Sequence, residues 1–117
     1  MTTVKDIFDH LNNLADVKLA EKWDNVGLML GSNNNEVSRV LVCLDVTTNV
    51  VEEAIAKNVN LIVSHHPLIF KPLKNIDYTT DFKSRIIRNL IKNDISVISF
   101  HTNLYSATLG LNDYLAK

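Results

Sequence analysis

Blocks of apolar residues along the chain change their spacing from a helical period to short continuous runs. Apolar residues recur at helical spacing over residues 3–15, which predicts an amphipathic helix. Three continuous runs of apolar and β-branched residues follow, at 38–46, 60–64 and 95–100, and they predict three strands. The unbroken apolar character of the run at 38–46 is typical of a strand that is covered on both faces.

Two helical patterns separate these three predicted strands. The first occupies residues 49–59, where Asn49 can cap the helix and Glu52 follows three residues later in a capping-box arrangement. The second occupies residues 81–94. The apolar residues that the spacing assigns to one face of this second helix are Phe82, Ile86, Leu90 and Ile91.

The resulting order of strand, helix, strand, helix, strand predicts an α/β fold with parallel strands joined by crossover helices. Residues 24–27 have the composition of a turn that enters a further short strand, and residues 70–80 predict an irregular connection. The residues from Leu109 onward have the pattern of a helix beginning. We find no linker or repeat, and we therefore predict a single domain over residues 1–117.

Composition and charge narrow the class of protein. Apolar residues make up 46% of the chain and charged residues 21%, which is typical of a globular protein. The net charge of −1 argues against a protein that binds nucleic acid, and we interpret the basic residues within 71–92 as a solvated helix face. No apolar run approaches the roughly 18 residues of a membrane span, and no secretory signal is visible, so we expect a cytoplasmic protein. The single cysteine, Cys43, lies within an apolar run and is interpreted as a buried thiol.

Histidine and aspartate side chains follow the ends of all three predicted strands. Asp45 follows the first strand, His65 and His66 follow the second, and His101 follows the third. Ligand sites in parallel sheets lie beyond the carboxyl ends of the strands, so these side chains are expected at one edge of the sheet. The remaining histidine, His10, lies on the first predicted helix and belongs to no cluster.

Imidazole and carboxylate groups together suit zinc, iron, manganese, nickel or copper. Pro67 interrupts the strand directly after His66, so that both rings could hold one metal each or flank a single metal. Two structural alternatives stay open, namely that the histidine pair is ordinary surface material and that Asp45 is only a turn residue before the next helix. Ser64 and Ser99 precede the two histidine turns and are interpreted as exposed polar spacers rather than as donors to the site.

Several stretches of the sequence together carry a resemblance to a known family. They are, in chain order, "KWDNVGLMLG", "CLDVT", "SHHPLIF", "HTNL" and "GLNDYLAK". In this order they resemble the Nif-three-like family (NGG-one-interacting factor three), whose members often bear the name GTP cyclohydrolase 1 type 2 homologue. The resemblance implies a three-layer α/β fold with a largely parallel central sheet and flanking helices. It also implies a ring-shaped hexamer with a dinuclear metal centre.

The resemblance further implies that His65, His66 and His101 are metal ligands. Tyr105 stands where the family has an aspartate ligand, and a phenol is a poorer ligand than a carboxylate. The family's later histidine and glutamate ligands have no counterpart before Lys117. We therefore expect a weakened site that holds one divalent metal or none, with zinc, iron or manganese as the candidates, and we expect Asp45 to orient one of the imidazoles.

Two functions follow from these expectations. The first is a metal-dependent hydrolase that acts on a nucleotide or another phosphoester, and the alternative is a non-catalytic oligomeric module that binds a protein partner or regulates it. The resemblance covers only the N-terminal lobe of the family, which leaves open a piece of a longer protein, a truncated gene product or a natural short relative. We expect a homo-oligomer and no binding to membranes.

Overall fold

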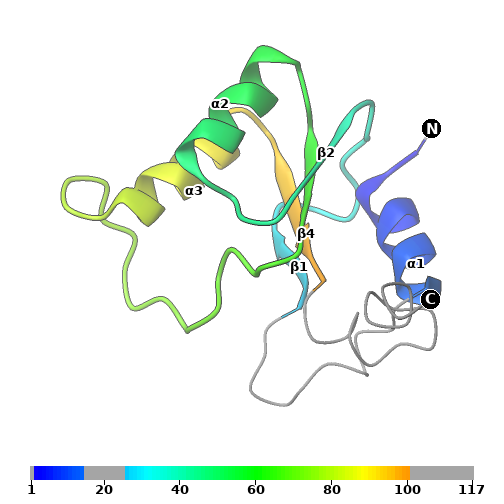
Figure 1. Cartoon of the computed structure of the whole chain (residues 1–117), viewed down its shortest axis with the longest axis horizontal. Coiled ribbons are helices and arrows are strands. Elements are labelled where there is room, and N and C mark those ends of the chain that lie inside the picture. Colours follow the sequence, from blue (N-terminus) through cyan, green and yellow to red (C-terminus); the bar gives the residue numbers. More distant parts are fainter. Residues whose placement is uncertain (1, 15–25, 101–117) are drawn as a thin grey trace.

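A computed structural model describes residues 2–14 and 26–100, in which helices and strands alternate around one sheet (Figure 1). The described helices are α1 (Val4–Leu14), α2 (Thr48–Ala56) and α3 (Phe82–Lys92). The described strands are β1 (Gly27–Leu30), β2 (Val40–Cys43), β3 (Leu61–Ser64) and β4 (Ser96–Ser99). The predicted alternation of strand, helix, strand, helix, strand is therefore confirmed from β2 to β4.

The four described strands form one sheet in the order β1-β4-β3-β2. The strands β2, β3 and β4 run parallel to one another, because α2 and α3 carry the chain back between them. The strand β1 pairs with β4 in the antiparallel direction, with Gly27 opposite Ser99. The expectation of a largely parallel sheet is thus confirmed, with one antiparallel strand at its edge.

Helices cover both faces of this sheet and make three layers (Figure 1). On one face, α2 and α3 pack against the sheet through a buried cluster that includes Val51, Leu90, Ile62 and Val97. On the other face, α1 contributes Val4 to a second cluster, formed with Leu61, Ile98 and Phe100. Burying apolar side chains on both sides of β3 and β4 stabilises these strands as the centre of the fold.

The strand β2 is not covered on both faces, which corrects the expectation drawn from its continuous apolar run. It lies at the edge of the described sheet, and the exposed fraction is 42% for Val40 and 76% for Val42. These two residues lie opposite Leu61 and Val63, on the face where α1 packs. A run of apolar residues predicts a strand, but the position of that strand in a sheet depends on partners that are distant in the sequence.

The cap of α2 also differs from the expectation, because the helix begins at Thr48 and Thr47 is its N-cap. Thr47 has an extended backbone, and its hydroxyl accepts a hydrogen bond from the Val50 amide at 3.2 Å. Asn49, the predicted cap, lies inside the helix. Threonine and asparagine both favour the N-cap position, and Thr47 stands only two positions before Asn49, so the residue type alone did not locate the cap.

The buried face of α3 is rotated from the face that the spacing predicted. Ile86, Ile87 and Leu90 are buried, whereas Phe82 and Ile91 keep exposed fractions of 67% and 61%. Two residues nine positions apart lie about 180° apart around an α-helix, so Phe82 and Ile91 cannot both face the sheet. The buried face of α3 therefore includes Ile87, which the spacing did not predict, and it excludes Phe82 and Ile91.

The connection over residues 70–80 contains no helix or strand, as the sequence predicted. The predicted turn residues Asp24 and Asn25, and the predicted helix from Leu109, lie outside the described residues. None of the helices in the described ranges is long and apolar enough to cross a lipid bilayer.

Candidate metal centre

The three parallel strands end at the same level of the sheet, and this alignment defines the candidate site. Cys43 pairs with Ser64, and Ser64 pairs with Ser99, so β2, β3 and β4 finish side by side. Asp45 follows the end of β2 by two residues, and His65 follows the end of β3 directly. The register thus brings the carboxylate and the histidines to the carboxyl edge, where parallel sheets place their ligand sites.

The backbone at the two histidines departs from a regular strand. The His65 amide donates to the carbonyl of Cys43 at 3.1 Å, and the His66 amide donates to the carbonyl of Leu44 at 2.8 Å. In a regular strand, successive amides point to opposite neighbours. Because both amides bond to the same neighbouring segment, the pleat is lost here, and Pro67 supplies no further amide. This local distortion lets two adjacent side chains share one edge.

The ring of His65 is oriented by a backbone carbonyl. Its Nδ1 atom lies 3.0 Å from the carbonyl oxygen of Phe100, the residue directly after β4. A carbonyl oxygen can only accept a hydrogen bond, so Nδ1 carries the proton. In the neutral ring the lone pair then resides on Nε2, which is the nitrogen that could coordinate a metal.

The ring of His66 is oriented by the carboxylate of Asp45. Nδ1 of His66 lies 2.8 Å from Oδ1 of Asp45 and donates to it, which again leaves the lone pair of the neutral ring on Nε2. Asp45 is therefore more than a turn residue before α2, whose cap is Thr47. Carboxylates commonly orient metal-binding histidines in this manner, and imidazole nitrogens are donors that divalent transition metals accept.

The two imidazole rings lie close together at this edge. Their centroids are 5.0 Å apart and their planes make an angle of 45°. The side chains of His66 and Asp45 are 47% and 60% exposed, so this part of the site is open to solvent.

Two buried hydroxyls lie beneath the histidine turn, which corrects the interpretation of Ser64 and Ser99 as exposed spacers. Their exposed fractions are 1% and 0%. The Ser64 hydroxyl donates to the carbonyl of His66 at 2.9 Å, and its oxygen lies 2.8 Å from that of Ser99. Because Ser64 uses its one proton on His66, Ser99 is the donor between the two hydroxyls. The pair thus ties β4 and β3 to the backbone of the turn.

Cys43 is half-buried rather than fully buried, and it does not supply a ready thiolate. Burial, with a smaller contribution from the negative charge of Asp45, raises the pKa of the Cys43 thiol to about 11. Only the thiolate is an effective ligand or nucleophile. At neutral pH the thiol is therefore protonated, and the histidines are the better ligands.

Two predicted site residues, His101 and Tyr105, lie outside the described residues. Within residues 2–14 and 26–100, no three histidine, cysteine, aspartate or glutamate side chains are grouped so that they could hold a metal ion. The sequence did not reveal that the carbonyl of Phe100 orients His65. Phe100 directly follows Ser99, and a correct register of β3 and β4 would have placed it beside His65.

Comparisons with known proteins place this geometry in a family. The family profile for Duf34/NIF3 (NGG1p interacting factor 3) matches residues 2–117. A GTP cyclohydrolase 1 type 2 homolog from Staphylococcus aureus is 45% identical over 114 residues, which cover 97% of this chain. Among solved structures, a Staphylococcus aureus hypothetical protein superposes with a TM-score of 0.91 at 43% identity, over 98% of this chain and 32% of that one. Reduced HcgD from Methanocaldococcus jannaschii superposes with a TM-score of 0.88 at 33% identity, over 98% of this chain and 46% of that one.

The chain spans only part of the length of these relatives. It covers 31% of the Staphylococcus aureus homolog and 41% of a homolog from Clostridium acetobutylicum, to which it is 43% identical. The match nevertheless extends over nearly the whole of this chain, in sequence and in fold. The chain therefore belongs to the Duf34/NIF3 family.

Proposed function

We propose that the chain contributes His65 and His66 to a divalent-metal centre of a hydrolase that acts on a nucleotide or another phosphoester. The observation that carries this proposal is the shared orientation of the two rings. Each Nδ1 atom donates to a separate acceptor, which is the Phe100 carbonyl for His65 and the Asp45 carboxylate for His66. Both neutral rings therefore have Nε2 as their coordinating nitrogen.

The residues of the chain have separate tasks in this proposal. When bound, a divalent metal would lower the pKa of a water molecule and polarise a phosphoryl group. His65 and His66 would hold the metal through Nε2, while Asp45 fixes the ring of His66 and increases its basicity. The hydroxyls of Ser64 and Ser99 hold the turn in place, which limits the loss of entropy on binding.

The number of metals is also a proposal. Two dications close together repel each other unless carboxylates or hydroxide offset their charge. His65, His66 and His101 offer neutral ligands, and Tyr105 stands at the position of the family's aspartate. We therefore expect one zinc, iron or manganese ion at most per chain, unless another subunit adds ligands.

Metal analysis and activity together test this function. Protein purified without a histidine tag would be stripped with EDTA, titrated with zinc, iron(II) and manganese, and assayed against a panel of nucleotides and phosphoesters. We expect hydrolysis that requires added metal and disappears in His65→Ala and in His66→Ala. Metal content measured by mass spectrometry should fall in the same variants.

A matched control comes from the same residue type elsewhere in the chain. His10 lies exposed on α1, outside the histidine turn. His10→Ala should retain metal content and activity. Activity that survives in both His65→Ala and His66→Ala, or two tightly held metals per chain, would contradict the proposal.

A non-catalytic oligomeric module is the second candidate function, and one observation favours it. Val42 and Leu44 keep exposed fractions of 76% and 67% near the free edge of the described sheet. Apolar surface beside an unpaired strand edge is typical of surfaces that pair with another chain. Light scattering should then show a homo-oligomer, which the resemblance implies to be a hexameric ring. Val42→Lys should weaken this assembly. A monomer at all concentrations would exclude this function.

A further inference from the structure

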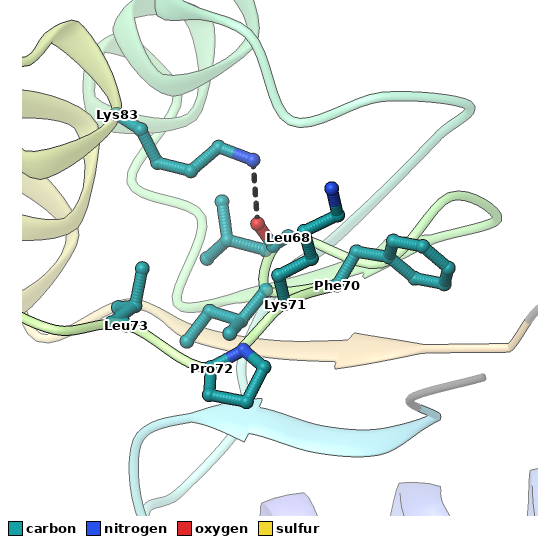
Figure 2. Close-up of a pocket in the computed structure, with 7 residues that line it drawn as sticks. Leu68, Phe70, Lys71, Pro72, Leu73 and Lys83 are labelled. Atoms are coloured by element: carbon teal, nitrogen blue, oxygen red, sulfur yellow. Dashed lines mark hydrogen bonds between the residues drawn. The ribbon is translucent and has the colours of Figure 1, made fainter. Parts of the chain in front are cut away.

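A cavity of about 300 Å³ lies beside the segment that follows the histidine turn (Figure 2). Its apolar walls come from Leu68, Phe70, Pro72 and Leu73, which belong to the irregular connection between β3 and α3. This volume lies at the lower end of the range for small-molecule sites, roughly 300–1,000 Å³. Phe70 and Leu73 are 44% and 41% exposed, so apolar surface is available to a bound group.

Two lysines line the same cavity and give it a positive charge. Lys71 comes from the connection and Lys83 from the first turn of α3. Figure 2 shows the Lys83 side chain reaching across to the carbonyl oxygen of Leu68, to which its Nζ donates at 2.8 Å. An ammonium group carries three donors, so this bond holds Lys83 in position and leaves it further donor capacity.

The negative charge nearest to Lys83 along the chain is Asp81, which attracts the Lys83 ammonium but also bonds to the start of the helix. Asp81 caps α3, and its carboxylate oxygens accept hydrogen bonds from the Lys83 amide at 3.3 Å and the Ser84 hydroxyl at 2.8 Å. None of the described residues that line the cavity carries a carboxylate. The lining therefore combines two cations with apolar walls, which is the chemistry that binds an anion attached to an apolar ring.

We propose that this cavity is a phosphate subsite for a nucleotide, in which Lys71 and Lys83 bind the phosphate and the apolar walls contact the attached nucleoside. The cavity begins close to the candidate metal centre along the chain. Leu68 lies two residues after His66, so their Cα atoms are separated by at most about 7.6 Å. The role as an anchor for a reacting substrate rests on the proposed hydrolase function, whereas binding in the cavity does not require a metal.

Binding to metal-free protein therefore tests the subsite separately from the hydrolase. The EDTA-treated chain would be titrated with AMP, inorganic phosphate and adenosine by calorimetry, and the binding site located from amide shifts in NMR spectra. We expect AMP to bind about tenfold more tightly than inorganic phosphate, because its ring buries apolar surface. Adenosine should bind more weakly than AMP, and the shifts should centre on residues 68–73 and Lys83.

Lysine variants identify the groups that bind the phosphate. Lys71→Met and Lys83→Met should each weaken AMP binding about tenfold, because each removes a charge-assisted hydrogen bond. Lys83→Arg should restore most of the affinity, and Lys92→Met, which removes an exposed charge from the same helix, should change it less than twofold. Lys71 is exposed on the connection, so its variant keeps the test valid if Lys83→Met fails to fold.

The outcomes separate the two proposals. AMP binding that persists in both lysine-to-methionine variants, or shifts that lie elsewhere in the chain, would overturn the subsite. Equal affinity for AMP and inorganic phosphate would also overturn it, because the apolar walls would then have no role. AMP binding in the cavity of the wild-type chain, without any metal-dependent hydrolysis by that same chain, would leave the subsite intact and refute the hydrolase.

Discussion

The Nδ1 atom of His66 lies 2.8 Å from Oδ1 of Asp45, although 21 residues separate them in the sequence. The contact exists because β2 and β3 are adjacent and parallel, and both chains continue past the ends of their strands. Asp45 fixes the tautomer and the direction of the His66 ring. In the proposed metal centre, this relationship would make Asp45 a positioning residue, which acts on His66 rather than on the substrate.

Replacing Asp45 should weaken metal binding without abolishing it. We expect Asp45→Ala to reduce the affinity for zinc by about 10- to 100-fold, because the His66 ring loses its orientation. Asp45→Asn should lie between the wild type and Asp45→Ala, because the amide oxygen can still accept from Nδ1. Competition with a chromophoric chelator measures these affinities, and unchanged affinity in Asp45→Ala would show that the carboxylate has no positioning role.

The buried pair of hydroxyls should behave as one unit in measurements of stability. Ser64→Ala removes the donor to the His66 carbonyl and the acceptor of the Ser99 hydroxyl, and we expect a loss of about 1–3 kcal/mol in the free energy of unfolding. Adding Ser99→Ala should cost less than Ser99→Ala costs alone, because the orphaned hydroxyl is also removed. Urea denaturation of the two single variants and the double variant measures this coupling.

An exposed serine provides the control for that cycle. Ser38 lies on the surface before β2, and Ser38→Ala should change the free energy of unfolding by no more than about 0.5 kcal/mol. Strict additivity of Ser64→Ala and Ser99→Ala would contradict the hydrogen bond between the two hydroxyls.

The raised pKa of Cys43 predicts slow alkylation. With the pKa at about 11 instead of 9.0, the thiolate fraction near pH 8 is about 100-fold lower than in an unfolded chain. Iodoacetamide should therefore modify Cys43 about 100-fold faster after denaturation, as followed by mass spectrometry. Because the folded pKa is the higher one, the stability contributed by the neutral thiol is complete below pH 9.0 and is lost as the pH rises toward 11. The variant Cys43→Ala should lack this part of the alkaline destabilisation.

Substitutions of Thr47 and Asn49 can show which of these two residues caps α2. Thr47→Ala removes the acceptor for the Val50 amide and should lower the free energy of unfolding by about 1 kcal/mol. Asn49→Ala changes a residue inside the helix and should leave stability unchanged or raise it slightly, because alanine has the higher helix propensity. Thermal or urea unfolding compares them, and the opposite order of effects would restore Asn49 as the cap.

Two adjacent residues test which face of α3 is buried. Leu90 is fully buried between α3 and the sheet, and Leu90→Ala should cost about 2–5 kcal/mol. Ile91 is 61% exposed, so Ile91→Ala should cost less than about 1 kcal/mol. Similar losses for both variants, measured by urea denaturation, would show that Ile91 is also covered.

The sequence by itself determined the order of the elements and the end of β3 at the histidine pair. Helical and strand periods are local properties of the chain, and Pro67 stops the strand through its own covalent structure. The sequence also indicated that Asp45 could orient an imidazole, since parallel strands that follow one another end at the same edge.

Only the tertiary structure decided how these parts meet. It placed β2 at the edge, selected Ile87 rather than Ile91 for the buried face of α3, and buried Ser64 against Ser99. Each of these outcomes depends on a partner that lies far away in the sequence, and a local pattern contains no information on that partner. The orientation of His65 follows the same rule, because its acceptor is a backbone carbonyl 35 residues later that no side-chain motif reveals.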